Sequence, residues 1–220
     1  MTPQSNVFNG DCMEYMRQFP DGYFDLGCVD VPYGIGVNNS MGRRKGQKKS
    51  NYKRIEWDNC APDESYFIEL QRVCKNQIIW GANHFISKMP YDSAAWIVWD
   101  KKFSFDLSFA QCELAWSSFN GVCKKLELAP DRANSFHPTQ KPVALYEWLL
   151  RNYAKPGDKI LDTHMGSQSS RIAAYKLGFD YWGSELDNDY FRDGCARFEK
   201  EIAMPLFDAI QQPKQEKLFV

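Results

Sequence analysis

Four consecutive residues, Asp30-Val31-Pro32-Tyr33, combine the groups that the exocyclic amine of a nucleobase needs in order to react. The Asp30 carboxylate and a backbone carbonyl can accept the two amino hydrogens, and the Tyr33 ring can stack on the base. The tetrapeptide follows an apolar run at residues 25–29 and precedes a glycine, which is typical of the end of a buried strand. A proline turn at a strand exit explains the same residues without chemistry, so further signals are needed.

A second group of residues, late in the chain, has the arrangement of a nucleoside-binding unit. Asp162 ends a short apolar run, Gly166 lies in a Gly/Ser loop before a helical pattern, and Glu185 ends the next apolar run. Such a glycine lets the backbone approach a ligand, the helix N-terminus attracts an anionic group, and the second acid can bind ribose hydroxyls. G-x-G-x-x-G is absent, and hydroxyls at Ser167 and Ser169 favour a small zwitterionic cofactor over a pyrophosphate. A plain strand–turn–helix with a capping serine is the alternative.

A third segment, His137-Pro138-Thr139-Gln140-Lys141-Pro142, stands directly before a long amphipathic helical pattern. Thr139 can cap that helix, and Pro142 suits its first turn. These structural roles leave His137 and Lys141 without an explanation, whereas Lys141 could meet a carboxylate of a binding site. Both readings of the segment stay open.

Alternating strands and helices have to position these groups. Strands are expected near residues 7–8, 25–29, 77–80, 95–99, 159–162 and 181–184, with hairpin-like pieces near 112–117. Helices are expected over 13–19, 62–73, 142–153, 171–177 and 189–202. Strands that alternate with helices indicate a parallel α/β sheet. The polar stretch 34–58 is too long for an ordinary connection and favours a functional loop.

Composition excludes several classes of protein. The 220 residues suggest one domain, no apolar run approaches a membrane span, and the N-terminus lacks the pattern of a signal peptide. Seven scattered cysteines without a C-x-x-C pair argue against a disulfide framework and a zinc finger, and favour reduced thiols in the cytoplasm. His84, His137 and His164 have no ligand-like spacing, so no metal centre is expected.

Charge is unevenly distributed along the chain. The net charge is only −1, yet seven of the 27 basic residues fall in one stretch that contains no acid. A concentrated basic loop on an otherwise acidic body suits contact with phosphates, and a solvated charged loop without a partner is the alternative. The candidate DNA-binding residues are Arg43, Arg44, Lys45, Lys48, Lys49, Lys53 and Arg54.

Together, these motifs resemble the amino-group (adenine-specific) DNA methyltransferases with the permuted motif order of the beta group. The segment 30–33 resembles their D-P-P-Y motif, 137–142 their H-P-x-x-K-P segment, 162–170 their cofactor loop and Glu185 their ribose-binding acid. Gly10-Asp11-Cys12 resembles the segment whose acid contacts the cofactor adenine. The resemblance extends from about Val7 to Phe198, and the combined order is far more specific than any single motif.

The resemblance implies a circularly permuted Rossmann-like fold, in the α/β class, with a doubly wound and mostly parallel seven-stranded sheet. It implies site-specific methyl transfer from S-adenosylmethionine to the amino group of adenine in double-stranded DNA, since an acid rather than serine at position 30 favours adenine. The catalytic residues would be Asp30, Val31, Pro32 and Tyr33. The cofactor would contact Asp11, Cys12, Asp30, His137, Thr139, Lys141, Asp162, His164, Gly166, Ser167, Ser169, Glu185 and Leu186.

Two residues depart from the family pattern. Val31 replaces the first proline of the catalytic motif, but valine also offers a backbone carbonyl and is held extended by Pro32. Gln168 stands where a glycine is frequent, so it brings either strain of about 1–3 kcal/mol or an amide contact to the cofactor. The alternative functions are methyl transfer to the cytosine amino group, to RNA or to a protein amide, and an inactive cofactor-dependent DNA-binding protein.

The whole chain, 1–220, is expected to form a single methyltransferase domain. It would carry a DNA-contact loop at 38–58, a small target-recognition insertion at about 101–136 and a flexible tail at about 205–220. The family is often dimeric, which makes a homodimer a prediction. Gln215, Leu218 and Phe219 resemble the Q-x-x-L-F peptides that dock into bacterial sliding clamps, although the terminal apolar pair could also pack back onto the domain.

Overall fold

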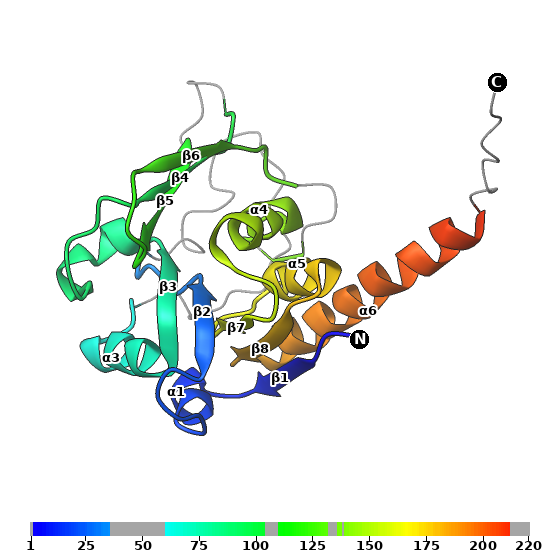
Figure 1. Cartoon of the computed structure of the whole chain (residues 1–220), viewed down its shortest axis with the longest axis horizontal. Coiled ribbons are helices and arrows are strands. Elements are labelled where there is room, and N and C mark those ends of the chain that lie inside the picture. The colour runs from blue at the N-terminus through cyan, green and yellow to red at the C-terminus, as the bar shows by residue number, and fades with distance from the viewer. Residues whose placement is uncertain (1, 36–59, 104–109, 132–135, 138, 212–220) are drawn as a thin grey trace, which may run out of the picture.

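Eight strands form one sheet in this computed structural model, and helices cover both faces of the sheet (Figure 1). The structure describes the chain except for residues 1, 36–59, 104–109, 132–135, 138 and 212–220, and except for the side chains of residues 204–211. The basic stretch and the clamp-like tail peptide therefore lie outside the described residues.

The order of the strands confirms the expected doubly wound, mostly parallel sheet. From edge to edge the order is β1 (Ser5–Asn9), β8 (Asp180–Glu185), β7 (Lys159–Asp162), β2 (Phe24–Val29), β3 (Cys74–Trp80), β5 (Cys112–Ser117), β4 (Ile97–Asp100) and β6 (Lys124–Glu127). Only β5 runs antiparallel to its neighbours, β3 and β4.

The sheet has eight strands rather than the expected seven, because β6 pairs along β4 at the edge. The sequence of β6, Lys-Lys-Leu-Glu, is largely exposed, so it shows no apolar run that predicts a strand. Both β5 and β6 fall in the region expected to be a target-recognition insertion, and both belong to the main sheet.

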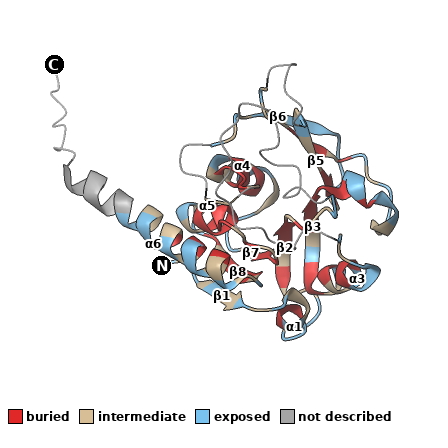
Figure 2. Ribbon diagram, turned by 180° about the vertical axis from the view of Figure 1, so that it is seen from behind, coloured by how far each residue is buried: buried red, intermediate tan, exposed pale blue. Residues whose placement is uncertain are grey.

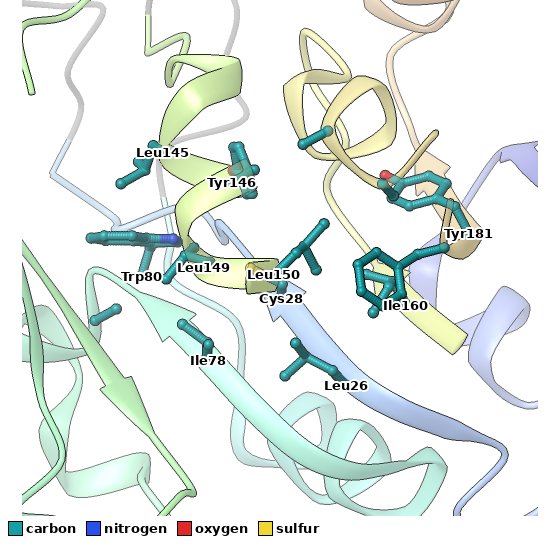
Figure 3. Close-up of a cluster of buried hydrophobic side chains, with 14 of the residues drawn as sticks. Leu26, Cys28, Ile78, Trp80, Leu145, Tyr146, Leu149, Leu150, Ile160 and Tyr181 are labelled. Carbon is teal, nitrogen blue, oxygen red and sulfur yellow. The ribbon is translucent and has the colours of Figure 1, made fainter. Parts of the chain in front are cut away.

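Two hydrophobic layers hold the helices against the sheet. On one face, α1 (Cys12–Met16) and α3 (Glu64–Val73) pack on residues such as Ile79. On the other face, α4 (Val143–Tyr153) packs its Leu145 and Leu149 against Ile78 and Trp80, next to α5 (Ser169–Leu177) (Figure 3). Successive residues of β3 thus point to opposite faces, as a doubly covered strand requires. Buried residues follow the sheet and the inner sides of the helices (Figure 2).

Some helix boundaries differ from the expected ones. The first helix is a short α1, which Asp11 caps by accepting hydrogen bonds from the N–H groups of Met13 and Glu14. The last helix, α6 (Asn188–Gln211), continues beyond 202, so residues 205–211 of the expected flexible tail are helical. Two short 3₁₀ turns, η1 (Ala82–His84) and η2 (Ile86–Lys88), follow β3 and lack any sequence periodicity.

The strand order has a topological switch point between β7 and β2, where successive strands are added on opposite sides. From this junction β8 and β1 lie on one side, and β3 and the remaining strands lie on the other. Such a reversal leaves a crevice beyond the carboxyl ends of the strands, where α/β proteins bind their ligands. Asp30 directly follows β2 and Asp162 ends β7, so two of the three motifs meet at this crevice.

The described residues add three further facts. They contain no helix that is long and apolar enough to cross a membrane. All seven cysteines lie within the described part and carry free thiols. No cluster of metal-ligating side chains is found among the residues that the structure describes.

Candidate active site

A cavity of about 740 Å³ opens at the carboxyl ends of the central strands. Asp30 and Gly166, which are far apart in the sequence, line this same cavity. Twelve of the thirteen expected cofactor residues contribute to its wall: Asp11, Cys12, Asp30, His137, Thr139, Lys141, His164, Gly166, Ser167, Ser169, Glu185 and Leu186. The fold therefore brings all three motifs to one place, while the role of each residue stays a prediction.

Asp162, the thirteenth residue, lies behind the wall instead of in it. Its side chain is 1% exposed, and its two oxygens accept hydrogen bonds from the His164 N–H at 3.0 Å and the Ser170 hydroxyl at 2.6 Å. Burial raises the pKa of Asp162 to about 7, against the opposing effect of the Ser170 hydrogen bond. This carboxyl orders the loop through the two hydrogen bonds that it accepts.

Glu185 and the glycine loop are joined directly. The Gly166 N–H donates to Glu185 Oε2 at 2.8 Å, and the Asp187 N–H donates to Oε1 at 2.9 Å. Gly166 has a φ of +47°, and a Cβ placed there would lie 3.2 Å from His137 Nε2. A side chain at this position would be both strained and crowded, so the glycine allows the third motif to pack against the loop.

Lys141 contacts the Asp30-Val31-Pro32-Tyr33 segment. Its Nζ lies 2.5 Å from Asp30 Oδ1, and its side chain is 3% exposed. Burial lowers the pKa of Lys141, but the Asp30 and Glu113 carboxylates outweigh this effect and raise it. Burial also raises the pKa of Asp30, although Lys141 opposes that shift. The ion pair links the two motifs across the chain.

Glu113, on β5, completes this cluster and was not expected from the sequence. Its Oε2 lies 2.9 Å from Lys141 Nζ, and its Oε1 lies 2.5 Å from Lys101 Nζ. Burial opposes the ionisation of Glu113, yet Lys141 and Lys101 hold its pKa at about 2. The only sequence signal was a single acid in the otherwise apolar strand Cys-Glu-Leu-Ala-Trp-Ser.

The Tyr33 ring packs between its own motif and the turn after β3. Its hydroxyl lies 2.9 Å from Asp30 Oδ1, and its ring stacks on His84 with centroids 5.1 Å apart and an interplanar angle of 17°. Gly81 has a φ of +72°, and a Cβ there would fall 2.0 Å from the ring. Neither Tyr33 nor the buried Val31 is among the residues that line the cavity.

Gln168 turns away from the cavity. It adopts a left-handed φ of +60°, its Nε2 donates to the Phe191 carbonyl at 3.2 Å, and its Oε1 accepts from Arg171 Nη1 at 2.8 Å. A Cβ on Gly194 of α6 would lie 2.7 Å from the Gln168 side chain. Of the two readings of this residue, the structure therefore supports backbone strain that is offset by contacts to α5 and α6.

The cavity is suited to a cationic nucleoside. Five carboxylates line it, from Asp11, Asp30, Glu185, Asp187 and Asp189, and Lys141 is the one lysine among the lining residues that the structure describes. His137 and His164 add no positive charge at neutral pH, because burial lowers the pKa of each to about 4. An excess of negative charge in a partly enclosed site attracts cations.

Gln140 also lines the cavity and has an unusual amide. Gln140 is 8% exposed, and neither its Nε2 nor its Oε1 has a hydrogen-bond partner among the residues that the structure describes. Leaving a buried donor and acceptor unsatisfied costs about 1–3 kcal/mol each, so such an amide points to a ligand. The ammonium and carboxylate of an amino-acid group would satisfy both atoms.

The comparisons with known protein sequences point in one direction. The sequence model of the family N6_N4_Mtase, described as DNA methylase, matches residues 40–195. YubD of Escherichia coli (strain K12), which carries the provisional name of a methylase, is 27% identical over 213 residues, covering 88% of this chain and 89% of YubD. Type II methyltransferase M2.MboI of Moraxella bovis is 22% identical over 265 residues, covering 97% of this chain and 94% of that protein.

Solved structures share the fold at low sequence identity. The PvuII DNA methyltransferase, which is cytosine-N4-specific, aligns with a TM-score of 0.61 at 14% identity, covering 92% of each chain. The M1.HpyAVI–SAM complex aligns with a TM-score of 0.56 at 19% identity, covering 87% of this chain and 98% of the other. Since the family model matches well over half of the residues, this chain belongs to the N6_N4_Mtase family of DNA methylases.

Proposed function

We propose that this protein transfers a methyl group from S-adenosylmethionine to the exocyclic amine of adenine in double-stranded DNA. The observation that carries the proposal is the shared cavity, in which Asp30 faces the same space as the Gly166 loop and Glu185. A methyl donor held by that loop would therefore meet an amine held by Asp30. Two separate pockets would have excluded direct transfer.

The residues of the cavity fit the methyl donor. Glu185 would bind the ribose hydroxyls, and the carboxylates of the wall favour a sulfonium cation. Asp11 already caps α1 through its side chain, so it can offer only its remaining lone pairs to an adenine. His137, Thr139 and Gln140 also line the cavity and are proposed to contact the amino-acid end of the cofactor.

When bound, the cofactor supplies an electrophilic methyl group on a positively charged sulfur. Asp30 and the Val31 carbonyl are proposed to accept the two hydrogens of the target amine, which would free the nitrogen lone pair from conjugation with the ring; because Val31 does not line the cavity, its carbonyl would have to become accessible when the base binds. Methyl transfer would form a C–N bond and break the C–S bond of the cofactor, so positive charge would develop on the nitrogen. The Asp30 carboxylate, in this partly enclosed site, would stabilise that charge and accept the proton that the amine loses, which then passes to solvent.

The target base has to leave the duplex to reach Asp30, because an amine inside the base stack is inaccessible. Tyr33 is proposed to stack on the extruded base. Because His84 stacks on one face of the Tyr33 ring, the base would either displace His84 or stack on the opposite face. The basic stretch 43–54, which lies outside the described residues, is proposed to hold the phosphates.

Adenine is proposed over cytosine because position 30 carries an acid. The amino group of cytosine remains the second candidate, since the PvuII enzyme, which shares this fold, is specific for cytosine N4. RNA, a protein amide and binding without catalysis are the remaining alternatives. Val31 and Gln168 supported the last of these, but the Gln168 side chain does not enter the cavity.

Sequencing of modified bases in DNA from cells that express the protein tests the proposal. We expect N6-methyladenine at one short sequence, and none with Asp30→Ala, while calorimetry shows that the variant still binds S-adenosylmethionine. Detection of N4-methylcytosine in place of N6-methyladenine would identify cytosine as the target base. An active Asp30→Ala variant would remove Asp30 from the mechanism. Cofactor binding without turnover on DNA, RNA or protein would favour the non-catalytic alternative.

A further inference from the structure

A second carboxylate stands directly behind the catalytic one. Glu113 Oε2 lies 2.9 Å from Lys141 Nζ and 3.2 Å from the Tyr33 hydroxyl, and both of these groups also contact Asp30. Glu113 itself is not among the residues that line the cavity. Among the described residues, Glu113 therefore reaches the reacting region through Lys141 and Tyr33, from a strand that is remote in the sequence.

The cluster balances its own charge. Asp30 and Glu113 supply two carboxylates, and Lys141 and Lys101 supply two ammonium groups. The side chain of Lys141 is 3% exposed, so its charge has to be compensated within the protein. Because Lys141 is shared, each carboxylate receives only part of its attraction.

The side-chain contacts of Asp30 that the structure describes all involve one carboxylate oxygen, Oδ1. The Lys141 ammonium, at 2.5 Å, and the Tyr33 hydroxyl, at 2.9 Å, both engage Oδ1. Within the described part of the chain, Oδ2 accepts no hydrogen bond, and Asp30 lines the cavity. One oxygen is thus anchored, and the other remains available to a substrate.

We propose that Glu113 is a positioning residue, which holds Lys141 and Tyr33 so that Asp30 keeps Oδ1 anchored and Oδ2 directed at the target amine. This proposal rests on the proposed function. Without the charge of Glu113, Lys141 would pair with Asp30 alone and draw electron density from the carboxylate that has to accept the amino hydrogens.

The protonation of the two carboxylates supports this division of roles. Lys141 and Lys101 hold the pKa of Glu113 at about 2, so it stays charged, whereas burial raises the pKa of Asp30. When the pKa values of two neighbouring acids are shifted in opposite directions, the two acids commonly have different roles in a site. The other titratable groups that interact electrostatically with Asp30 are Cys28 on β2, Tyr146 on α4 and Asp162 on β7.

The test is a pH profile of kcat for Glu113→Gln, which keeps the shape and removes the charge. We expect kcat to fall by about 10- to 100-fold with little change in the KM for S-adenosylmethionine. The acidic limb of the profile should move to lower pH, because the repulsion that raises the pKa of Asp30 is lost. Glu127→Gln on β6, an exposed acid paired with Lys125, is the matched control and should leave the profile unchanged.

A double variant protects the test against misfolding. Glu113→Gln combined with Lys101→Gln keeps the cluster neutral, and we expect it to fold while kcat stays low and the acidic limb stays displaced. A kcat and acidic limb equal to those of the parent in either variant would overturn the role of Glu113. An inactive parent on all nucleic-acid and protein substrates would instead overturn the proposed function.

Discussion

At the scale of a single residue, Asp162 is a buried acid whose ionisation should respond to the charge of the ligand in the cavity. Its carboxyl is buried and its pKa is about 7, whereas the ordinary value is 3.8. A cation in the adjoining cavity favours the ionised form of a neighbouring acid and lowers its pKa. We therefore expect binding of a sulfonium cofactor to be accompanied by loss of a proton from Asp162.

We predict that S-adenosylmethionine binding near pH 6.5 releases protons from the parent protein and releases fewer from Asp162→Asn. Isothermal titration calorimetry in two buffers with different ionisation enthalpies measures the number of protons released. An equal number in both proteins would show that Asp162 is not the source.

The same shift predicts how stability depends on pH. Because folding raises the pKa of Asp162, the folded protein holds the proton more tightly, and this contribution is complete below pH 4 and lost as pH rises through 7. The stability gain from Asp162→Asn, measured by thermal unfolding without ligand, should therefore grow between pH 4 and pH 7. A shift of this size is worth up to about 4 kcal/mol, so a pH-independent difference between the proteins would contradict the prediction.

The unsatisfied amide of Gln140 gives a second prediction at this scale. Gln140→Ala should weaken S-adenosylmethionine binding about tenfold and leave binding of 5′-methylthioadenosine, which lacks the amino-acid group, unchanged. Calorimetry with both ligands measures the difference. Gln18→Ala, at an exposed position, serves as the control. Equal losses of affinity for both ligands would show that Gln140 does not contact the amino-acid group.

At the scale of elements, the turn between β3 and η1 positions the Tyr33 ring, for which we propose a role in base stacking. Gly81 takes a left-handed conformation there, and the absence of a side chain lets Tyr33 lie against the turn. His84, at the end of η1, then stacks on the same ring. The geometry of Tyr33 therefore depends on a strand exit far from its own motif.

We predict that Gly81→Ala lowers kcat by at least tenfold, because a Cβ at 2.0 Å from the ring has to displace Tyr33. Gly157→Ala is the matched control, since Gly157 also has a positive φ but open space around it. Both variants should lose roughly 1 kcal/mol of stability through backbone strain. If thermal melting and methyl-transfer assays show the same changes in both, the contact with Tyr33 has no functional role.

At the scale of the whole molecule, charge is divided between an acidic cavity and a basic stretch. The cavity favours a cationic cofactor, while residues 43–54 carry the groups that suit phosphates. Under the proposed function, this distribution would allow one protein of net charge −1 to bind a cationic cofactor and a polyanion. The homodimer remains a prediction. The clamp contact through Gln215, Leu218 and Phe219 also remains a prediction, because the tail peptide lies outside the described residues.

We predict that replacing Arg43, Arg44 and Lys45 with glutamine reduces the slope of log K against log salt for DNA binding by up to about 3, since each lost phosphate contact removes about 0.9. Fluorescence anisotropy over a range of salt concentrations measures the slope. Glutamine at Lys155 and Lys200, which are exposed elsewhere, should leave it unchanged. An unaltered slope in the triple variant would remove this stretch from the interface.

The sequence was sufficient for the fold class, for the permuted order of the motifs and for most of the residues that line the cavity. These features depend on short-range patterns: apolar runs that end in an acid, a glycine before a helix, and a proline at a helix start. The carboxyl ends of parallel strands meet at one edge, so recognising the strands already indicates that Asp30 and Glu185 belong to one site.

Only the tertiary structure revealed the partners of these residues. Glu113, Gly81 and His84 reach the catalytic motif from β5 and the turn after β3, and Gln168 turns towards α6 instead of the cavity. The eighth strand likewise depends on an edge left open by β4. Contacts between segments distant in the chain leave no local periodicity, because they depend on how the helices and sheet pack together and not on the pattern within any one of them.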